Sequence, residues 1–172
     1  MIIPIVLAGG DGKRFDSSTH KLLVNIGKFK TIDYAIILAN KINKTNFCIT
    51  SRHIDGYIKK NFPKTIRVIQ KTPLGTAHAL DLIKNKIDKN ISVIILYGDM
   101  PLLKFSSLSP MINHYLNHNK PLLLYFKSKK NLDFGQVILK NNTIKKIIEN
   151  KNINKNDKLK NKFKNKIYNG GV

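Results

Sequence analysis

Glycines and basic residues follow the first apolar run of the chain. The run MIIPIV (1–6) leads into LAGGDGKRF (7–15), and Lys21 follows a few residues later. Glycine lets backbone N–H groups approach an anion closely, arginine can donate two parallel bonds to phosphate oxygens, and lysine adds a point charge. The segment is therefore a candidate phosphate site, and the alternative is an ordinary glycine turn with exposed basic residues.

This segment matches neither of the two common glycine-rich nucleotide signatures. The dinucleotide fingerprint needs glycine where Phe15 stands. The P-loop needs glycine where Leu7 stands, and Ser or Thr where Arg14 stands. A phosphate site in this segment must therefore be of another kind.

A carboxylate stands at the end of another apolar run, SVIILY (92–97). Asp99 follows Gly98 and precedes an apolar turn, so we expect it at the rim of a sheet. Mg²⁺ is commonly held by one or two carboxylates together with phosphate oxygens, which makes such an aspartate a natural ligand. The alternative is that Asp99 only caps the loop that follows it.

The segment QKTPLGTAHA (70–79) contains a helix start. Thr76 can cap the helix that follows, and Gly75 with a free helix N-terminus suits a planar base or a phosphate. His78 has no second histidine or carboxylate at metal-ligand spacing. We expect His78 to pack or to form a local hydrogen bond rather than to act as an acid or base.

The three candidate segments can lie close together if they follow strands of one sheet. Apolar runs rich in β-branched residues predict strands at 2–7, 47–50, 66–69, 92–97 and 121–126. Strands that alternate with helices indicate βαβ units, a mostly parallel sheet with covered faces, and ligands at the carboxyl ends of the strands. The helical faces are Ile32, Ala35, Ile36 and Ala39; Ala79, Leu82, Ile83 and Ile87; and Leu108, Met111, Ile112 and Tyr115.

The pattern changes after residue 127. With 172 residues we expect one domain, in which 1–127 form a βα core. In 128–172, FGQVIL and TIKKIIE flank an Asn-rich turn and predict a hairpin, and the Lys/Asn-rich stretch 150–166 predicts a mobile loop. A further strand begins in IYNGGV, so we expect the domain to be incomplete at its C-terminus.

Composition excludes several classes of protein. The hydrophobic fraction is 42%, and no apolar run approaches the ~20 residues of a membrane span. Residues 1–7 lack a basic leader and a cleavage site, which argues against a signal peptide. Cys48 is the only cysteine, so a disulfide framework is excluded and a buried, inert thiol is expected. We expect a cytoplasmic protein with no membrane partner.

The net charge of +21 raises the question of nucleic acid. Lys and Arg number 31 against 10 Asp and Glu, but only three of the basic residues are arginine, and the lysines are mixed with asparagines. Arginine can donate two parallel hydrogen bonds to a phosphate or a base, which lysine cannot. We therefore expect no specific nucleic-acid partner, while a nucleic-acid-binding module driven by charge stays open as an alternative.

Taken together, the three segments resemble a known family. They are similar to the sugar-1-phosphate nucleotidylyltransferases of the MobA-like NTP transferase superfamily. Within that group, LGTAHA and YGDMPL are similar to the N-terminal uridylyltransferase domain of the bacterial bifunctional enzymes that make UDP-N-acetylglucosamine. The resemblance implies an α/β, three-layer Rossmann-like nucleotidyltransferase domain with a mostly parallel sheet, the nucleotide-diphospho-sugar transferase fold. It covers essentially all of 1–172 and lacks the acetyltransferase half, which suggests a truncated chain.

The resemblance implies a role for each matching residue. It assigns catalysis to Arg14, Lys21 and Asp99, with Asp99 holding Mg²⁺. It assigns nucleotide binding to Leu7, Ala8, Gly9, Gly10, Gly12, Gln70, Gly75 and Thr76. It assigns sugar binding to Tyr97, Gly98, Gly135, Glu149 and Asn169.

The reaction that the resemblance implies is transfer of UMP from UTP to N-acetylglucosamine-1-phosphate. A sugar-phosphate oxygen attacks the α-phosphorus in line and pyrophosphate leaves, so positioning and charge neutralisation suffice. The product is a cell-envelope precursor. The sequence shows no convincing pair of nucleophile and base, which agrees with direct displacement.

Four departures from the family pattern affect these expectations. Lys13 replaces a small hydroxyl residue, and Pro73 stands where a base-contacting glutamine is usual. His20 replaces the proline before Lys21, so we expect the rigid approach to that lysine to be lost. The strand that supplies an Asn as second Mg²⁺ ligand has no counterpart. The alternatives are an impaired fragment, another sugar phosphate or nucleotide, and a homo-oligomer or partner chain that supplies the missing strands.

Overall fold

The structure is a computed structural model that describes residues 1–10, 19–130, 132, 134–141, 143–148 and 166–171. The chain divides into two compact units, residues 1–119 and 120–172, which are described separately below. The loop predicted over 150–166 lies outside the described residues except for its last residue.

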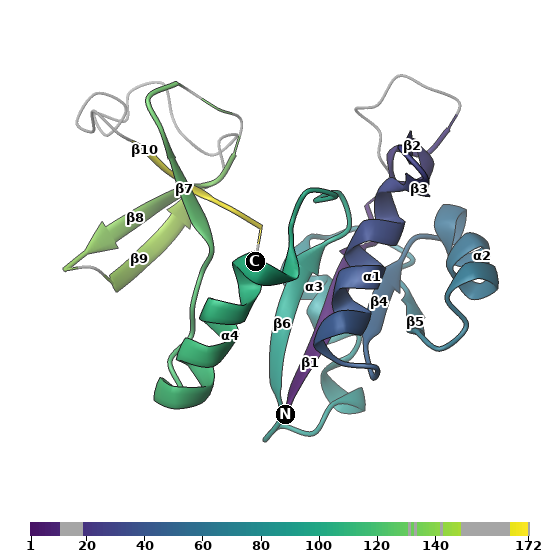
Figure 1. Cartoon of the computed structure of the whole chain (residues 1–172), viewed down its shortest axis with the longest axis horizontal. Helices are drawn as coiled ribbons and strands as arrows, with labels where there is room; N and C mark the ends of the chain where they lie inside the picture. The colour runs from purple at the N-terminus through teal and green to yellow at the C-terminus, as the bar shows by residue number, and fades with distance from the viewer. Residues whose placement is uncertain (11–18, 131, 133, 142, 149–165, 172) are drawn as a thin grey trace. The chain divides into compact units, whose positions relative to one another are not determined.

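A four-stranded parallel sheet forms the centre of the first unit (Figure 1). The strand order is β5-β4-β1-β6, and the central strand β1 has Ile5 opposite Phe47 on one side and opposite Ile95 on the other. Each strand coincides with one of the first four apolar runs, which confirms the predicted parallel sheet. The strands are β1 (Ile2–Ala8), β4 (Phe47–Thr50), β5 (Ile66–Ile69) and β6 (Ser92–Tyr97).

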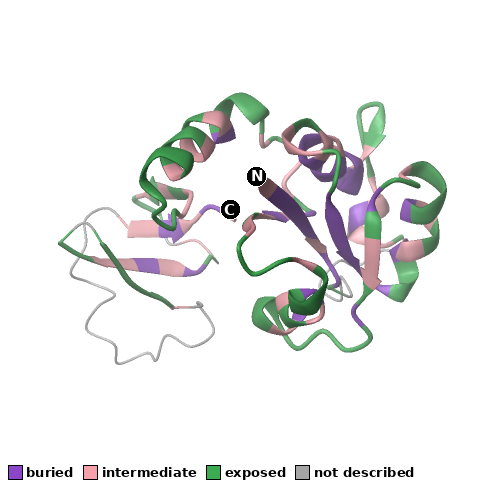
Figure 2. Ribbon diagram, turned by 90° about the horizontal axis from the view of Figure 1, so that it is seen from below, coloured by how far each residue is buried: buried purple, intermediate pink, exposed green. Residues whose placement is uncertain are grey.

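Helices cover both faces of this sheet. Ile3 and Ile5 of β1 pack in one cluster with Ala79 and Ile83, which belong to α3 and the turn after it. Since alternate residues of a strand point to opposite faces, Ala8 faces the other side, where α1 packs against β1. Figure 2 shows buried residues along β1 and on parts of the helices. The helices of this unit are α1 (Thr31–Ile42), α2 (Arg52–Asn61), α3 (Thr76–Asp81) and α4 (Phe105–His118).

Local chemistry explains where α1 begins. Asp33 in its first turn accepts a 2.8 Å hydrogen bond from the backbone N–H of Lys30, which satisfies a donor that has no partner within the helix. The apolar residues at helical spacing face the sheet, and Ile32 and Ile36 are completely buried. Before α1 the chain makes a short 3-10 turn, η1 (Lys21–Leu23), and a small hairpin of β2 (Asn25–Ile26) and β3 (Phe29–Lys30).

The helical face predicted over 79–87 is only partly a helix. The helix α3 ends at Asp81, and the chain continues through the 3-10 turn η2 (Lys84–Lys86). Asn85 and Asp88 lie in this stretch, and their side chains compete with the backbone for hydrogen bonds and favour turns. Ile83 is nevertheless buried against the sheet, so the predicted apolar contact is kept without the predicted helix.

The second unit is an antiparallel sheet with the order β7-β10-β8-β9. The predicted hairpin is present, and Asn141 in its turn has a φ of 51°, which asparagine tolerates better than most residues. The prediction of a fifth parallel strand over 121–126 is wrong, because the strand covers 125–128 and pairs antiparallel with β10. The strands are β7 (Tyr125–Ser128), β8 (Gln136–Lys140), β9 (Thr143–Ile148) and β10 (Lys166–Asn169).

Tyr168 explains why β10 holds this second sheet together. Its side chain is completely buried and its ring stacks on that of Phe126, with the ring centroids 5.5 Å apart. Its hydroxyl donates to the carbonyl oxygen of Lys130 and accepts from the N–H of Leu132. The last described strand therefore lies inside the sheet rather than at its edge.

Two expectations from composition can be compared with the structure. Cys48 is completely buried in β4, and burial raises the pKa of its thiol far above the ordinary value, as expected for an inert core cysteine. Among the described residues, the helices are all too short or too polar to cross a membrane.

Candidate active site

A cavity of about 290 Å³ lies at the carboxyl edge of the parallel sheet in the first unit. The ends of β1 and β6, the segment after β5, the start of α3 and the turn η1 all contribute to its wall. This is the edge at which ligands bind in open α/β sheets. The lining residues are Leu7, Ala8, Gly9, Gly10, Lys21, Leu22, Gln70, Pro73, Gly75, Thr76, Ala79, Tyr97 and Asp99.

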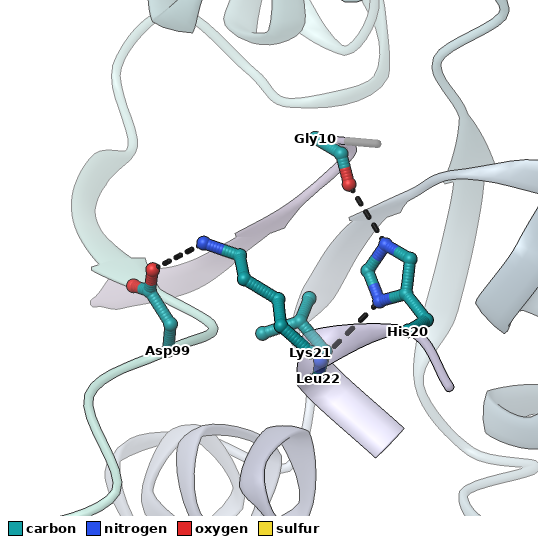
Figure 3. A network of polar contacts seen from close by, with 5 residues as sticks. All are labelled: Gly10, His20, Lys21, Leu22 and Asp99. Atoms are coloured by element: carbon teal, nitrogen blue, oxygen red, sulfur yellow. Dashed lines mark hydrogen bonds and ion pairs between the residues drawn. The ribbon is translucent and has the colours of Figure 1, made fainter. Parts of the chain in front are cut away.

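Lys21 and Asp99, which both line this cavity, form an ion pair. The Lys21 Nζ donates to Asp99 Oδ2 at 2.7 Å, and Figure 3 shows the lysine reaching from η1 toward the residues after β6. Both side chains stay partly exposed, at 38% and 44%. Because both charged groups are open to solvent, each can leave the ion pair and bind a ligand group of opposite charge instead.

His20 holds the backbone next to Lys21. Its Nδ1 accepts a 3.3 Å hydrogen bond from the N–H of Leu22, and its Nε2 lies 2.9 Å from the carbonyl oxygen of Gly10 (Figure 3). Its φ of −58° is within the range that proline imposes. His20 thus has a proline-like φ together with two side-chain hydrogen bonds, and the expected loss of a rigid approach to Lys21 stays a prediction.

Gln70 forms the wall of the cavity beside the end of β1. A Cβ at Gly9 would lie 2.2 Å from Gln70 Oε1, so glycine lets the backbone pass with this side chain in its present position. Gln70 is buried, and its Nε2 lies 2.9 Å from His78 Nδ1. His78 thus makes the local hydrogen bond predicted for it, and Gln70 is held in one orientation at the cavity wall.

The start of α3 differs from the prediction. Gly75, not Thr76, is the N-cap, and its φ of 108° lies in the region that favours glycine. Thr76 is the first residue of the helix, and its hydroxyl lies 3.5 Å from the hydroxyl of Tyr97. Thr76 and Tyr97 both line the cavity, and the Thr76 hydroxyl does not cap the helix.

The structure brings most of the predicted nucleotide-binding residues into one cavity. Gly98 is not among the residues that line it, since its N–H donates to the carbonyl oxygen of Leu7 and joins β6 to β1. Gly135 and Asn169 belong to the second unit, where the Asn169 N–H donates to the Gly135 carbonyl oxygen at 2.8 Å. Gly12, Lys13, Arg14 and Glu149 lie outside the described residues.

Sequence reasoning assigned no site role to two residues of the cavity wall, Leu22 and Ala79, which are buried and apolar. Pro73, noted above at a base-contacting position, lines the cavity beside Gly75. The contacts of His20 behind Lys21 were not predicted either. Leu22 and His20 flank Lys21 directly, so the signal that could have found them is adjacency to the candidate lysine.

Among the described residues that line this cavity, Asp99 carries the one carboxylate that a divalent cation could bind. No group of three or more His, Cys, Asp or Glu that could hold a metal occurs among the described residues. Asp99 nevertheless fits Mg²⁺, since one or two carboxylates supplemented by phosphate oxygens and water are a common way to hold this ion. A single carboxylate fits a cation that phosphate oxygens of a ligand also bind, rather than one that the described protein residues bind alone.

A family model and curated relatives both match this chain. The model described as "MobA-like NTP transferase domain" matches residues 4–149. A protein named "Bifunctional protein GlmU" from Campylobacter lari is 34% identical over 160 residues, which cover 89% of this chain and 35% of the relative. The chain spans about a third of the length of the curated relatives it matches.

Solved structures share the fold. The inositol-1-phosphate CTP transferase from T. maritima superposes with a TM-score of 0.62 at 18% identity, covering 97% of this chain and 70% of that one. Rv0371C from Mycobacterium tuberculosis, solved in complex with manganese, has a TM-score of 0.52 at 16% identity, covering 65% and 58%. At these identities the likeness concerns the fold, and it agrees with the parallel sheet described above.

Proposed function

Because the chain belongs to the MobA-like NTP transferase domain family, we propose that its cavity transfers UMP from UTP to N-acetylglucosamine-1-phosphate and releases pyrophosphate. The observation that carries the proposal is the pair Lys21 and Asp99 at 2.7 Å in a cavity bounded by glycine backbone at the end of β1. The choice of substrates rests on LGTAHA and YGDMPL and on the curated relatives named GlmU.

Each part of the cavity has a function in this reaction. Gly9 and Gly10 let the nucleotide approach the backbone after β1, and Gln70 offers a buried amide next to them. The Lys21 ammonium is free to turn from Asp99 toward the phosphates, where it neutralises charge that develops on the pyrophosphate. Gly12 and Arg14 are proposed to contribute to the same triphosphate site, and they lie outside the described residues.

Bond changes in the proposed step are confined to phosphorus. An oxygen of the sugar phosphate forms a new bond to the α-phosphorus of UTP, and the bond from that phosphorus to the α,β-bridging oxygen breaks. The electron pair leaves with pyrophosphate, so no protein nucleophile or proton transfer is required. Catalysis then depends on alignment and on charge neutralisation, which is what a lysine and glycine backbone can supply.

Asp99 is the residue that we propose to hold Mg²⁺. Asp99 would hold the cation, whose chemistry when bound would be to screen the negative charge of the phosphates. The carboxylate is exposed enough to accept it, and Lys21 can leave Asp99 for the phosphates at the same time. The crystallised Rv0371C holds manganese, which supports a divalent cation in this fold without fixing which one.

The residues that we propose for sugar binding, on the resemblance alone, come from both units. Tyr97 and Gly98 belong to the first unit. Gly135 and Asn169 belong to the second, where a backbone hydrogen bond joins them, and Glu149 lies outside the described residues. A cytoplasmic location, where UTP and sugar phosphates occur, belongs to the same proposal.

Pyrophosphate release from UTP, with the purified chain, tests this function. We expect turnover that needs both N-acetylglucosamine-1-phosphate and Mg²⁺. Turnover with another sugar phosphate or another nucleotide would keep the reaction class and overturn the substrates. UTP binding without turnover would overturn catalysis by this chain, and affinity for DNA or RNA that falls steeply with salt would favour the nucleic-acid alternative.

A further inference from the structure

We propose that His20 is a positioning residue whose neutral imidazole joins Gly10 to the turn that carries Lys21, and so holds the Lys21 ammonium at Asp99. The inference rests on the proposed function, in which Lys21 and Asp99 face the triphosphate. His20 itself does not line the cavity and touches no reacting atom in the proposed reaction.

The two ring contacts determine which nitrogen carries the proton. The backbone oxygen of Gly10 can only accept, so Nε2 must donate to it across 2.9 Å. The N–H of Leu22 can only donate, so Nδ1 must accept across 3.3 Å. Both contacts together require the neutral tautomer with its proton on Nε2, and neither the other tautomer nor the cation satisfies both.

His20 also closes the turn η1 from two sides. Its carbonyl oxygen accepts from the N–H of Leu23 at 2.7 Å, and its ring accepts from the N–H of Leu22. Leu22 is buried at the cavity wall and fixes the turn to the core. Lys21 therefore stands between a hydrogen-bonded neighbour and a buried one, which restricts the directions in which its side chain can leave the backbone.

The bond to Gly10 ties this turn to the phosphate segment. Gly10 and His20 are ten positions apart in sequence, and the imidazole connects them directly. Figure 3 shows the resulting path from Gly10 through His20 and Lys21 to Asp99, which joins the end of β1 to the end of β6. Proline at this position would supply a similar φ but neither of the two ring contacts.

Two conservative substitutions separate the two ring contacts. The amide oxygen of His20→Asn takes the place of Nδ1 and can accept from Leu22, while the amide nitrogen of His20→Gln takes the place of Nε2 and can donate to Gly10. His20→Ala loses both contacts. We expect kcat to fall about tenfold or more in His20→Ala, with a smaller fall in each amide variant and little change in the KM for UTP, since misplacing a charged group acts mainly on the transition state.

A second measurement does not depend on turnover. The ring nitrogen spectrum of the ¹⁵N-labelled full chain at neutral pH should show His20 with its proton on Nε2. The Leu22 amide should exchange slowly in the wild type and in His20→Asn, and faster in His20→Gln and His20→Ala. If the wild type shows these features but no turnover, the proposed function fails while the placement of His20 stands.

His114 supplies the matched control, since it is exposed on α4 and does not line the cavity. His114→Asn and His114→Gln should leave kcat unchanged. The proposal is overturned if the His20 proton is on Nδ1, or if kcat in His20→Ala equals that of the wild type. It is also overturned if kcat falls equally in the His114 variants. Should His20→Ala fail to fold, kcat and Leu22 amide exchange in His20→Asn and His20→Gln provide the test.

Discussion

The ammonium of Lys21 lies 2.7 Å from the carboxylate of Asp99, although the two residues are 78 positions apart in the sequence. The pair joins the turn after the phosphate segment to the end of β6, and both side chains stay partly open to solvent. An exposed pair of this kind stabilises a fold little. We therefore expect the pair to affect ligand binding and catalysis more than folding, as the first two predictions below state.

Removing the ammonium of Lys21 should affect catalysis far more than stability. In Lys21→Ala we expect kcat to fall about a hundredfold, because a charge that neutralises the leaving pyrophosphate is lost. The free energy of unfolding should change by less than about 1 kcal/mol. Lys84→Ala is the control, since Lys84 forms a more exposed ion pair with Asp81, with 2.6 Å between Nζ and Oδ1, and neither residue lines the cavity. Equal kinetic losses in the two variants would contradict the role of Lys21.

Replacing the carboxylate of Asp99 by an amide should weaken the response to Mg²⁺. Asp99→Asn keeps the shape of the side chain and removes the charge that would attract the cation. Initial rates measured against Mg²⁺ concentration should be low and should respond only at higher concentration than in the wild type. Asp81→Asn serves as the control. An unchanged dependence on Mg²⁺ in Asp99→Asn would show that the metal ligand lies elsewhere.

Two glycines should respond to alanine in opposite directions. In Gly9→Ala the new Cβ would lie 2.2 Å from Oε1 of the buried Gln70, so that side chain must move away from His78. We expect a loss of about 1–3 kcal/mol in the free energy of unfolding, as for overpacking in a core. Gly56 lies in α2 with open space around it, and Gly56→Ala should stabilise by about 0.5–1 kcal/mol. Thermal unfolding compares them, and equal shifts of Tm would refute the close contact with Gln70.

Tyr57 should make stability depend on pH in the alkaline range. Burial, followed by the hydrogen bond to Asp33 and the negative charge of that carboxylate, raises the pKa of Tyr57 to about 12. The fold therefore favours the protonated phenol. This stabilisation is fully present below about pH 10, the ordinary pKa of tyrosine, and is lost as the pH rises through about 12.

The corresponding measurement compares denaturant unfolding of the wild type and of Tyr57→Phe. Between about pH 10 and 12 the free energy of unfolding should fall more steeply in the wild type. Lysines that lose their charge in the same range affect both proteins alike, so the difference reports Tyr57. Parallel curves would show that its hydroxyl is not held by Asp33 in solution.

Residue type and spacing were sufficient for most local elements. Runs of β-branched residues marked the four strands of the parallel sheet, and apolar residues three and four apart marked α1 and α4. The prediction of a strand over 121–126 was wrong, because a partner distant in the sequence decides which residues pair. Residues 121–126 form an apolar run, but β7 begins at Tyr125 and pairs with β10, a partner about forty residues further along the chain. Such a pairing leaves no mark in the run itself.

The sequence by itself determined which residues could do chemistry and that a parallel sheet would place several of them at one edge. Segments that follow parallel strands marked Lys21 and Asp99 as candidates for one site, because the carboxyl ends of such strands meet at one edge, and the resemblance to the family added Gln70. Only the tertiary structure decided that His20 bonds to Gly10 and supports Lys21, and that Gly75 rather than Thr76 caps α3. Hydrogen bonds need two groups within about 3 Å in the right direction. That geometry arises from packing, and no spacing in the chain encodes it.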